Sequence, residues 1–363
     1  MKKSIMSFLL LMITTLSFAK TDLIPICYQG KFGFIDKNFE VKLPTVYKSF
    51  CFSNDMEYIV VSRADININS YEILDKTGAV VFQHDNIWGD VTPIFGEFFY
   101  FLSPNENGLP PYHLYNAKEK KEIIIEDGYE VYPVKDTETK SDFFAVRSKN
   151  GGKYVSLDGK RTLSFDVLND NCLVFPIIDG AGVISSGRKV FDINGNVVKS
   201  DLIDSGMNYS QGLLPVISKT DSGFIDKKGN YIFKCKIYRE PSGGGLCPGL
   251  SCSFKEDVAC VPVSENEWRI YDKNGKVLFR TSEYKLAANT FNEGKICVYK
   301  KTPQGKIYSF LDKTGKQFSK YTFEKVTSFY NGYAMVILDG KDALLDSFGK
   351  IIYVSEILEK KKN

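Results

Sequence analysis

The sequence contains very little histidine and none of the common catalytic signatures. Only two histidines, His84 and His113, occur among its 363 residues. Gly-x-Ser-x-Gly, His-Glu-x-x-His and phosphate-binding glycine loops are all missing. These absences exclude the usual signatures of serine hydrolases, zinc proteases and nucleotide-binding enzymes. We therefore predict no catalytic residue, no cofactor and no metal ligand.

A strong charge of either sign is also missing, as is a long apolar run after the N-terminus. Without Lys2 and Lys3, which belong to the leader discussed below, 45 of the 47 basic residues remain against 44 acidic ones. Binding to nucleic acid requires a basic face, and the only basic run is Lys360 to Lys362, so we predict no nucleic-acid partner. No later segment approaches the roughly 20 apolar residues of a membrane-spanning helix, so we expect no transmembrane segment in the mature chain.

What the sequence has instead is a repeated phrase, two apolar residues followed by Asp and, in most copies, by Gly three residues later. Nine copies recur at intervals of about 39 residues, a period typical of stacked supersecondary units. A second phrase, aromatic-x-x-Gly, ends 20 to 22 residues after the Asp in three copies. The Asp position marks each unit, and its nine residues are Asp36, Asp75, Asn116, Ser156, Asp192, Asp226, Asp272, Asp312 and Asp346.

The Asp-x-x-Gly phrase predicts a hairpin turn. Asp can accept a hydrogen bond from the backbone N–H two residues on, and Gly adopts the positive φ that closes a type I turn with a bulge. Short β-prone runs flank each turn, so each unit contains about four antiparallel strands. A calcium site in these turns is disfavoured, because Ca²⁺ needs six or more oxygen ligands and each turn offers two or three.

The two residues before each marker are apolar in all nine copies. Because neighbouring residues of a strand face opposite sides, both faces of this strand avoid water. The position four before the marker is aromatic in five copies. We interpret these aromatic residues as core between repeats rather than as a ligand-stacking surface: Phe32, Tyr71, Tyr112, Trp268 and Tyr308.

The segments Lys31-Phe-Gly-Phe-Ile-Asp36, Ser222-Gly-Phe-Ile-Asp226 and Trp268-Arg-Ile-Tyr-Asp272 resemble the WG-repeat family, whose unit reads W-G-F-I-D-x-x-G and later F-x-E-G-x-A-x-V. The resemblance spans about residues 23 to 354. Trp occupies the first position only at Trp268, where Arg269 replaces the Gly. The resemblance implies a bacterial, often exported, all-β repeat array without an established enzymatic role.

The two ends of the chain differ from the repeats. Lys2 and Lys3, an apolar run from Ile5 to Leu16 and the small-x-small triplet ending at Ala19 predict a signal peptide over residues 1–19. We therefore expect an exported protein, periplasmic or extracellular. The repeat domain is predicted to cover residues 20–355, and residues 356–363 to form a basic tail.

Eight cysteines lie in the mature chain, and an oxidising compartment permits disulfides. Cys247 and Cys252 close a glycine-rich insertion in the longest unit, and we predict that they form a disulfide. Zinc is disfavoured because Cys-x-x-Cys spacing is missing. The insertion is also the candidate binding loop, through Pro241, Gly243, Gly244, Gly245 and Leu246, because loops on a rigid scaffold often carry recognition. A second long loop spans Ser103 to Pro111.

The sequence therefore predicts an all-β array of about nine antiparallel meanders. Leu23 to Tyr28 matches a late strand of a unit and the last unit ends early, so the two ends could join in one sheet and close a propeller-like ring. An open β-solenoid or superhelical stack is the alternative.

Three functions are compatible with this array. The first is an exported scaffold that binds a protein or a cell-envelope glycan through its loops, without catalysis. The second is a hydrolase with its site at the centre of a closed ring, and the third is a purely structural envelope protein. The sequence leaves the partner and the oligomeric state open.

Overall fold

The computed structural model describes residues 21–53, 55–63, 70–85, 87–103, 111–125, 128–132, 141–148, 151–156, 159–163, 177–178, 180–184, 189–192, 194–206, 208–239 and 252–359. Within them the chain forms 33 strands and one short helix, α1 (Val354–Glu359). The strands pair antiparallel along the chain, which confirms the predicted all-β meander. None of the described helical segments is long and apolar enough to cross a membrane.

The described strands form seven hydrogen-bonded sheets. The first sheet contains β1 (Ile24–Tyr28), β2 (Lys31–Ile35), β3 (Val41–Phe52), β4 (Tyr58–Arg63), β5 (Tyr71–Asp75) and β6 (Val80–His84). The second contains β7 (Trp88–Phe95), β8 (Phe98–Leu102), β9 (Tyr112–Asn116) and β10 (Lys121–Ile125). The third contains β11 (Gly128–Tyr132), β12 (Ser141–Ser148), β13 (Gly151–Ser156), β14 (Thr162–Leu163), β15 (Ile177–Ile178), β16 (Ala181–Ile184), β17 (Lys189–Asp192) and β18 (Val197–Lys199).

The remaining sheets follow the same order along the chain. The fourth contains β19 (Leu202–Ser205), β20 (Leu214–Ser218), β21 (Ser222–Ile225) and β22 (Tyr231–Lys234). The fifth contains β23 (Phe254–Lys255), β24 (Val258–Pro262), β25 (Trp268–Asp272) and β26 (Val277–Thr281). The sixth contains β27 (Lys285–Leu286), β28 (Lys295–Thr302) and β29 (Gly305–Asp312), and the seventh contains β30 (Lys325–Val326), β31 (Tyr333–Leu338), β32 (Lys341–Asp346) and β33 (Ile351–Tyr353).

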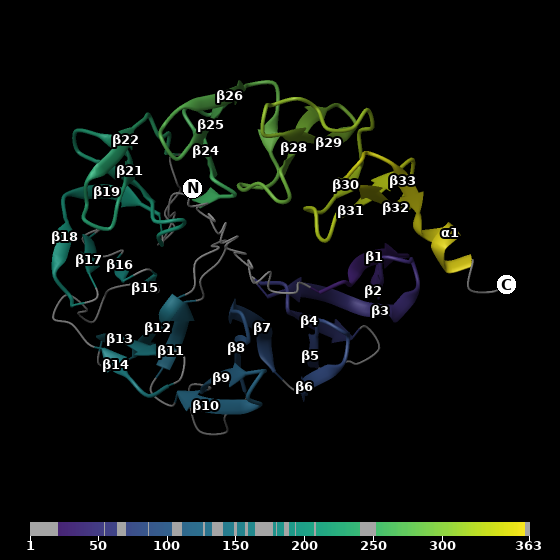
Figure 1. Ribbon diagram of the computed structural model, residues 1–363, viewed down its shortest axis with the longest axis horizontal. Helices are drawn as coiled ribbons and strands as arrows, with labels where there is room; N and C mark the ends of the chain where they lie inside the picture. The colour runs from purple at the N-terminus through teal and green to yellow at the C-terminus, as the bar shows by residue number, and fades with distance from the viewer. Residues whose placement is uncertain are drawn as a thin grey trace, which may run out of the picture.

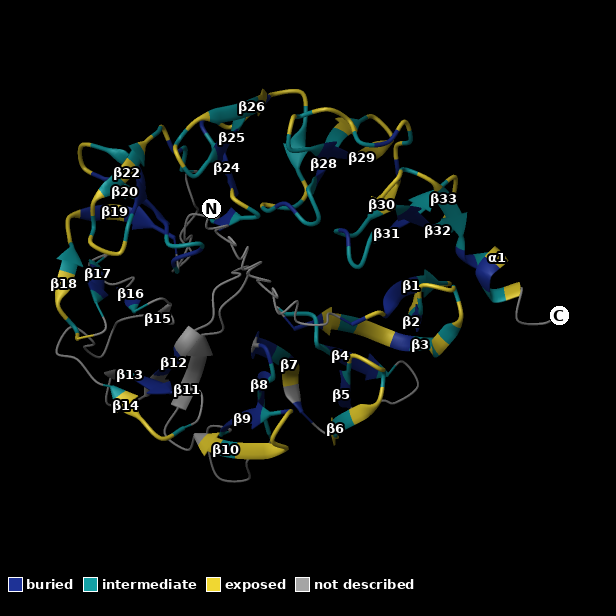
Figure 2. Cartoon of the chain, in the orientation of Figure 1, coloured by how far each residue is buried: buried dark blue, intermediate teal, exposed yellow. Residues whose placement is uncertain are grey.

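The sheets stand around a ring (Figure 1), with inner strands such as β7 and β30 toward the centre and β10 and β33 toward the outside. Two of the sheets each join two neighbouring repeat units. In the first sheet this occurs because β3 pairs with β2 through Val41, Leu43 and Tyr47 and then with β4 up to Phe52. The ring prediction is confirmed, and the open-stack alternative is wrong. In Figure 2 the middle strands are mostly buried and outer strands such as β10 are exposed.

The core between units follows one rule around the whole ring. The residue two before each marker packs with the residue directly before the next unit's marker, and all 18 of these side chains are at most 8% exposed. Burying each is worth about 1.5 to 3 kcal/mol. The prediction that both faces are buried is confirmed. The pairs are Phe34 with Leu74, Ile73 with Tyr115, Leu114 with Val155, Tyr154 with Phe191, Val190 with Ile225, Phe224 with Tyr271, Ile270 with Leu311, Phe310 with Leu345, and Leu344 with Ile35.

The last of these pairs closes the ring, at a junction that we call the seam. The expectation that the two chain ends share one sheet is wrong, because β1 and β33 belong to different sheets. Instead, Ile24 and Ile26 of β1 pack with Leu344 and with Val354 and Ile357 of α1. Residues 356–359, which were predicted to begin a tail, belong to this helix, and Ile357 is buried. Residues 360–363 lie outside the described residues.

A belt of polar side chains crosses successive junctions. The belt consists of Gln211, Glu256, Glu293 and Asn331, and each of them begins a two-residue turn with a φ of 51° or 52°. The side chain of each belt residue forms hydrogen bonds with the backbone of the next unit around the ring. These bonds explain the polar residue in the aromatic-x-x-Gly phrase. The bonds run from Asp257 N–H to Gln211 Oε1 (3.1 Å), from Glu293 and Gly294 N–H to the Glu256 carboxylate (2.5 and 2.8 Å), from Gly332 N–H to Glu293 Oε2 (2.8 Å), and from Asn331 Nδ2 to Thr21 O and Leu23 O (2.8 Å each).

Two glycines of the WG-like phrase are required by a close approach of the backbone. A Cβ at Gly33 would lie 2.8 Å from the backbone of Leu43 and Thr45, and one at Gly223 would lie 2.3 Å from Phe233 O. At Gly33 the register of the outer strand shifts between Phe32 and Phe34, which brings the outer backbone against the glycine. Gly223 pairs in register with Lys234, and the shift there follows between Phe224 and Ile225.

Candidate functional site

The seven marker aspartates all have the same structural environment. In each, Oδ1 accepts the backbone N–H of the second and the fourth following residue, at 2.8 to 3.1 Å. The bond to the fourth residue was not foreseen from the sequence. These carboxylates hold hairpins and are spread around the ring, so they do not converge on one site. They are Asp36, Asp75, Asp192, Asp226, Asp272, Asp312 and Asp346.

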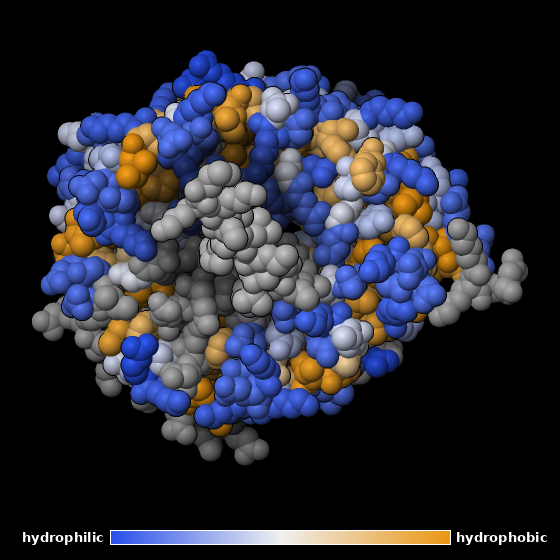
Figure 3. Space-filling model, in the orientation of Figure 1, coloured by the Kyte–Doolittle hydropathy of each residue, from blue (hydrophilic) through white to orange (hydrophobic). Residues whose placement is uncertain are grey.

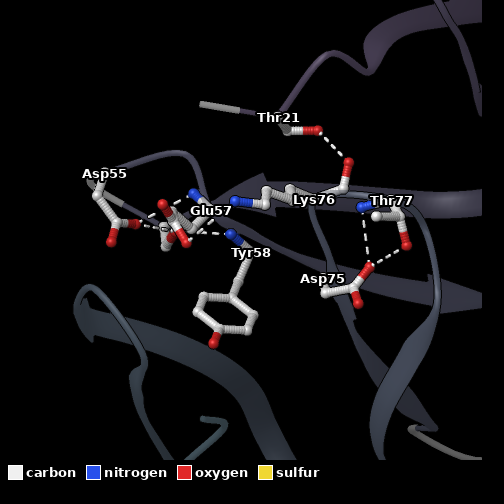
Figure 4. A network of polar contacts seen from close by, with 8 residues as sticks. Thr21, Asp55, Glu57, Tyr58, Asp75, Lys76 and Thr77 are labelled. Carbon is white, nitrogen blue, oxygen red and sulfur yellow. Dashed lines mark hydrogen bonds and ion pairs between the residues drawn. The ribbon is translucent and has the colours of Figure 1, made fainter. Parts of the chain in front are cut away.

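Hydrogen bonds to these carboxylates also lower some of their pKa values. At Asp75, burial acts in the opposite direction, but the Thr77 hydroxyl and the N–H groups of Thr77 and Ala79 outweigh it and hold the pKa below its ordinary value. Figure 4 shows this turn beside Lys76, whose carbonyl accepts the Thr21 hydroxyl at 2.9 Å and whose ammonium lies 4.0 Å from Glu57. The network connects the start of the repeat domain to the second unit.

The predicted binding loop and disulfide lie largely beyond the described part of the chain. Pro241, Gly243, Gly244, Gly245, Leu246 and Cys247 are all outside the described residues. Cys252 is described as a free thiol, 1% exposed, and burial raises its pKa. The Cys247–Cys252 pairing remains a prediction.

A recess of about 560 Å³ lies between the last two units. Inner strands β27 and β30 form part of its wall, and Tyr299 of β28 and Tyr308 of β29 form another part. Its size is that of a ligand pocket. Its described lining contains no carboxylate and consists of Leu286, Ala287, Ala288, Cys297, Tyr299, Lys306, Tyr308, Lys325, Val326, Thr327 and Ser328.

The charge of this recess comes from Lys306 and Lys325, and Lys306 is held near an aromatic ring. Lys306 Nζ lies 4.5 Å from the centre of the Tyr299 ring, which positions the ammonium by a cation–π contact. Tyr299 and Tyr308 lie with ring centres 5.9 Å apart. Among the described residues, neither Lys306 nor Lys325 has a carboxylate within 4.0 Å. The recess therefore offers positive charge, hydroxyl groups and an apolar wall, a combination suited to an anionic ligand with apolar parts.

Burial also raises the pKa of the Cys297 thiol in this recess to about 12. At neutral pH the thiol is therefore protonated and a poor nucleophile. The recess is suited to binding rather than to covalent chemistry.

A second polar group, missed at the sequence level, joins Ser103, His113 and Glu122. Ser103 Oγ lies 2.6 Å from His113 Nε2, and His113 Nδ1 contacts Glu122 Oε1. The imidazole is 8% exposed and stacks on Phe101 with ring centres 4.8 Å apart. His113 lies in β9, where it pairs with Phe101 of β8, so it is a strand residue and not part of a turn. Its register opposite Phe101 depends on strand pairing, which the spacing alone did not reveal.

On the face shown in Figure 3, hydrophilic residues predominate around the outer edge of the ring. A ring of antiparallel sheets with inner and outer strands defines the chain as a β-propeller. The model of the WG-containing repeat matches residues 308–341, and this match supports the assignment of the chain to the WG-repeat family.

Comparison with solved structures concerns the fold alone. One described as a eukaryotic initiation factor has a TM-score of 0.55 at 10% identity, covering 92% of this chain and 96% of that one. BamB from Moraxella catarrhalis has a TM-score of 0.42 at 10% identity, covering 79% of this chain and 92% of that one. No curated protein matches the sequence.

Proposed function

We propose that this protein is an exported scaffold whose recess between the last two units binds an acidic segment of a partner protein. The observation that carries the proposal is the lining of the recess, which combines Lys306 and Lys325 with two tyrosines and no carboxylate. Complementary charge selects an acidic ligand, and tyrosine rings supply contact area at low entropic cost. The closed ring supports the proposal because it holds the lining in one arrangement.

A displayed peptide library tests this binding function. Peptides selected on residues 20–363 are expected to be rich in Asp and Glu next to apolar residues, and to bind more weakly as salt concentration rises. Lys306→Glu and Lys325→Glu should each weaken binding by about tenfold, roughly the value of one charged contact. Lys228→Glu, which reverses an exposed lysine in a marker turn, is the matched control and should bind normally.

Two outcomes would reject this assignment. Peptides that bind the Lys306→Glu protein as well as the original would place the site elsewhere. If acidic oligosaccharides bind the recess and no displayed peptide does, the partner is an envelope glycan and not a protein.

Export is a separate part of the proposal, supported by the leader-like residues 1–19. N-terminal sequencing of the protein from its producing cells should find Lys20 or a close neighbour as the first residue, in a fraction outside the cytoplasm. An intact Met1 on a cytosolic protein would contradict it.

A second candidate function is ester hydrolysis at Ser103, favoured by the Ser103–His113–Glu122 geometry alone. With Nδ1–H donating to Glu122, Nε2 accepts the Ser103 proton as Oγ attacks an ester carbonyl. The leaving alcohol takes that proton, and water then hydrolyses the acyl group. A fluorophosphonate probe should label Ser103 in the original protein and not in Ser103→Ala, with slower labelling in His113→Gln. Absence of labelling would leave the three residues as a structural network.

A further inference from the structure

In the residues that the structure describes, the first repeat unit lacks a strand that the other units have. In the other eight units, the strand equivalent to β1 pairs on its inner side with a further strand: β3, β7, β11, β15, β19, β23, β27 or β30. In the described residues β1 pairs only with β2, on its outer side. Among the described strands its inner side is therefore an unpaired sheet edge, at the seam of the ring (Figure 1).

The missing hydrogen bonds can be located by comparison with three complete units. Pro215, Cys297 and Met335 each pair with the residue two before a marker, as Pro25 does. The carbonyl oxygens of Pro215, Cys297 and Met335 each accept a hydrogen bond from a backbone N–H on the inner side of the sheet. Pro25 O has no such donor among the described residues. The donors are Gly206 (2.8 Å), Ala287 (2.9 Å) and Thr327 (2.9 Å).

The seam caps only the beginning of this edge. Asn331 Nδ2 donates to Leu23 O at 2.8 Å, where Leu213 O of the sixth unit receives the backbone N–H of Ser210 at 3.0 Å. Beyond Leu23, the edge presents Pro25 O and the N–H and C=O of Cys27, which point to the inner side by the alternation of an antiparallel ladder. Cys27 pairs with Phe32, one step from the Tyr28–Lys31 pair that closes the hairpin.

The described part of the chain contains no strand of its own for this position. Inner strands precede their neighbours in sequence, so the missing strand would have to come from residues before Thr21. The Thr21 N–H donates to Met56 O at 3.0 Å, and its hydroxyl donates to Lys76 O at 2.9 Å, which ties this residue to the second unit (Figure 4). The proposed cleavage after Ala19, on which this step rests, leaves a single residue before Thr21.

We propose that the inner edge of β1 accepts an extended segment of a partner protein as an antiparallel strand. The incoming segment donates an N–H to Pro25 O, exchanges hydrogen bonds with Cys27, and contains no proline at these positions. Opposite Ile26 it carries an aliphatic residue, because Leu286 and Val326 occupy that place in the last two complete units. This surface is distinct from the lysine recess.

A synthetic peptide of residues 322–329, which contains the inner strand β30, is a suitable probe. In its own unit Thr327 N–H donates to Met335 O, so the same N–H should reach Pro25 O. The peptide is titrated into isotope-labelled residues 20–363 and followed by NMR. We expect saturable shifts centred on Ile24 to Tyr28 and slower exchange of the Cys27 amide. N-methylation at the Thr327 position should weaken binding at least about tenfold, the value of about one hydrogen bond.

Variants of the protein give an independent measurement. Cys27→Pro removes the open N–H without touching the bonds to β2 and should weaken binding about tenfold, whereas Cys27→Ala should bind normally at an unchanged melting temperature. Equal binding of the N-methylated peptide, or no binding at millimolar concentration, would overturn the proposal even if Cys27→Pro failed to fold. Binding that Lys306→Glu abolishes and Cys27→Pro does not would place the peptide in the recess, so the two proposals can fail separately.

Discussion

The seam and the junctions inside the ring are built by the same core rule, yet they differ in what surrounds that core. At an internal junction, Val190 and Ile225 meet between units that the chain connects directly. At the seam, Leu344 and Ile35 meet between units separated by most of the sequence. The comparison teaches that side-chain complementarity is sufficient to close this propeller without a direct chain connection, because both junctions lie between two separate sheets.

At the seam, β1 has no inner partner strand among the described residues, and side-chain contacts hold the two end units together instead. Asn331 bonds to two carbonyls of the first unit, Val354 and Ile357 of α1 are buried beside β1, and Phe39 packs against Tyr333 with ring centres 5.9 Å apart. These contacts do not cover the inner edge of β1, which has no partner strand among the described residues. A surface for a partner strand thus arises from the way the ring closes.

The largest effect should come from truncating a core side chain, either at an internal junction or at the seam. Ile225→Ala and Ile35→Ala both remove a side chain that is 0% exposed, and each should lower the free energy of unfolding by about 2 to 5 kcal/mol through the cavity left behind. Chemical denaturation measures both. If Ile35→Ala cost less than about 1 kcal/mol, the seam would be more loosely packed than an internal junction.

A smaller effect is expected from the belt. Asn331→Asp keeps the shape and tolerates the positive φ, but it cannot donate to Thr21 O and Leu23 O, so it should cost about 1 to 3 kcal/mol. The internal counterpart is Glu293→Gln, which still offers an oxygen to Gly332 N–H and should cost less than about 1 kcal/mol. Melting curves of the pair decide, and equal losses would contradict a special role for Asn331 in closure.

The marker turns should contribute less again. Asp226→Ala removes the bonds from the N–H groups of Lys228 and Asn230, both 2.9 Å, and should cost about 1 kcal/mol because these exposed groups can turn to water. Binding of selected peptides should be unchanged. A loss of binding at unchanged stability would reveal a site where we describe a turn.

The smallest effect concerns the pKa of Asp36 in the seam unit. The Lys42 ammonium, 3.0 Å away, lowers the pKa of this carboxyl, helped by the N–H groups of Glu40 and Asn38. Because the folded pKa is depressed, the associated stability is present above the unfolded value near 4 and is lost as pH falls through the folded value. Lys42→Met should raise the pKa of Asp36 in an NMR titration and leave that of Asp192 unchanged.

Much of the fold was predictable because its signals are local and repeated nine times. The pair before each marker is apolar in every unit, and burial of both faces follows from the period of a strand. The marker aspartates predict turns because the hydrogen bond to the second following N–H lies within one short loop. Phe39 could not be predicted in this way. It occupies the place of the turn glycine with a φ of 63°, and only its contact with Tyr333 across the seam accounts for a bulky residue there.

The sequence by itself determined the repeat, the antiparallel meander, the turn at each marker and the two-sided core, because each depends on residues close together in the chain. Tertiary structure alone decided how the ring closes, where the lysines and tyrosines of the recess meet, which strand edge stays open and that Ser103, His113 and Glu122 come together. These features depend on the exact rotation and register of neighbouring sheets. A period in the sequence does not encode that geometry, and packing between units produces it.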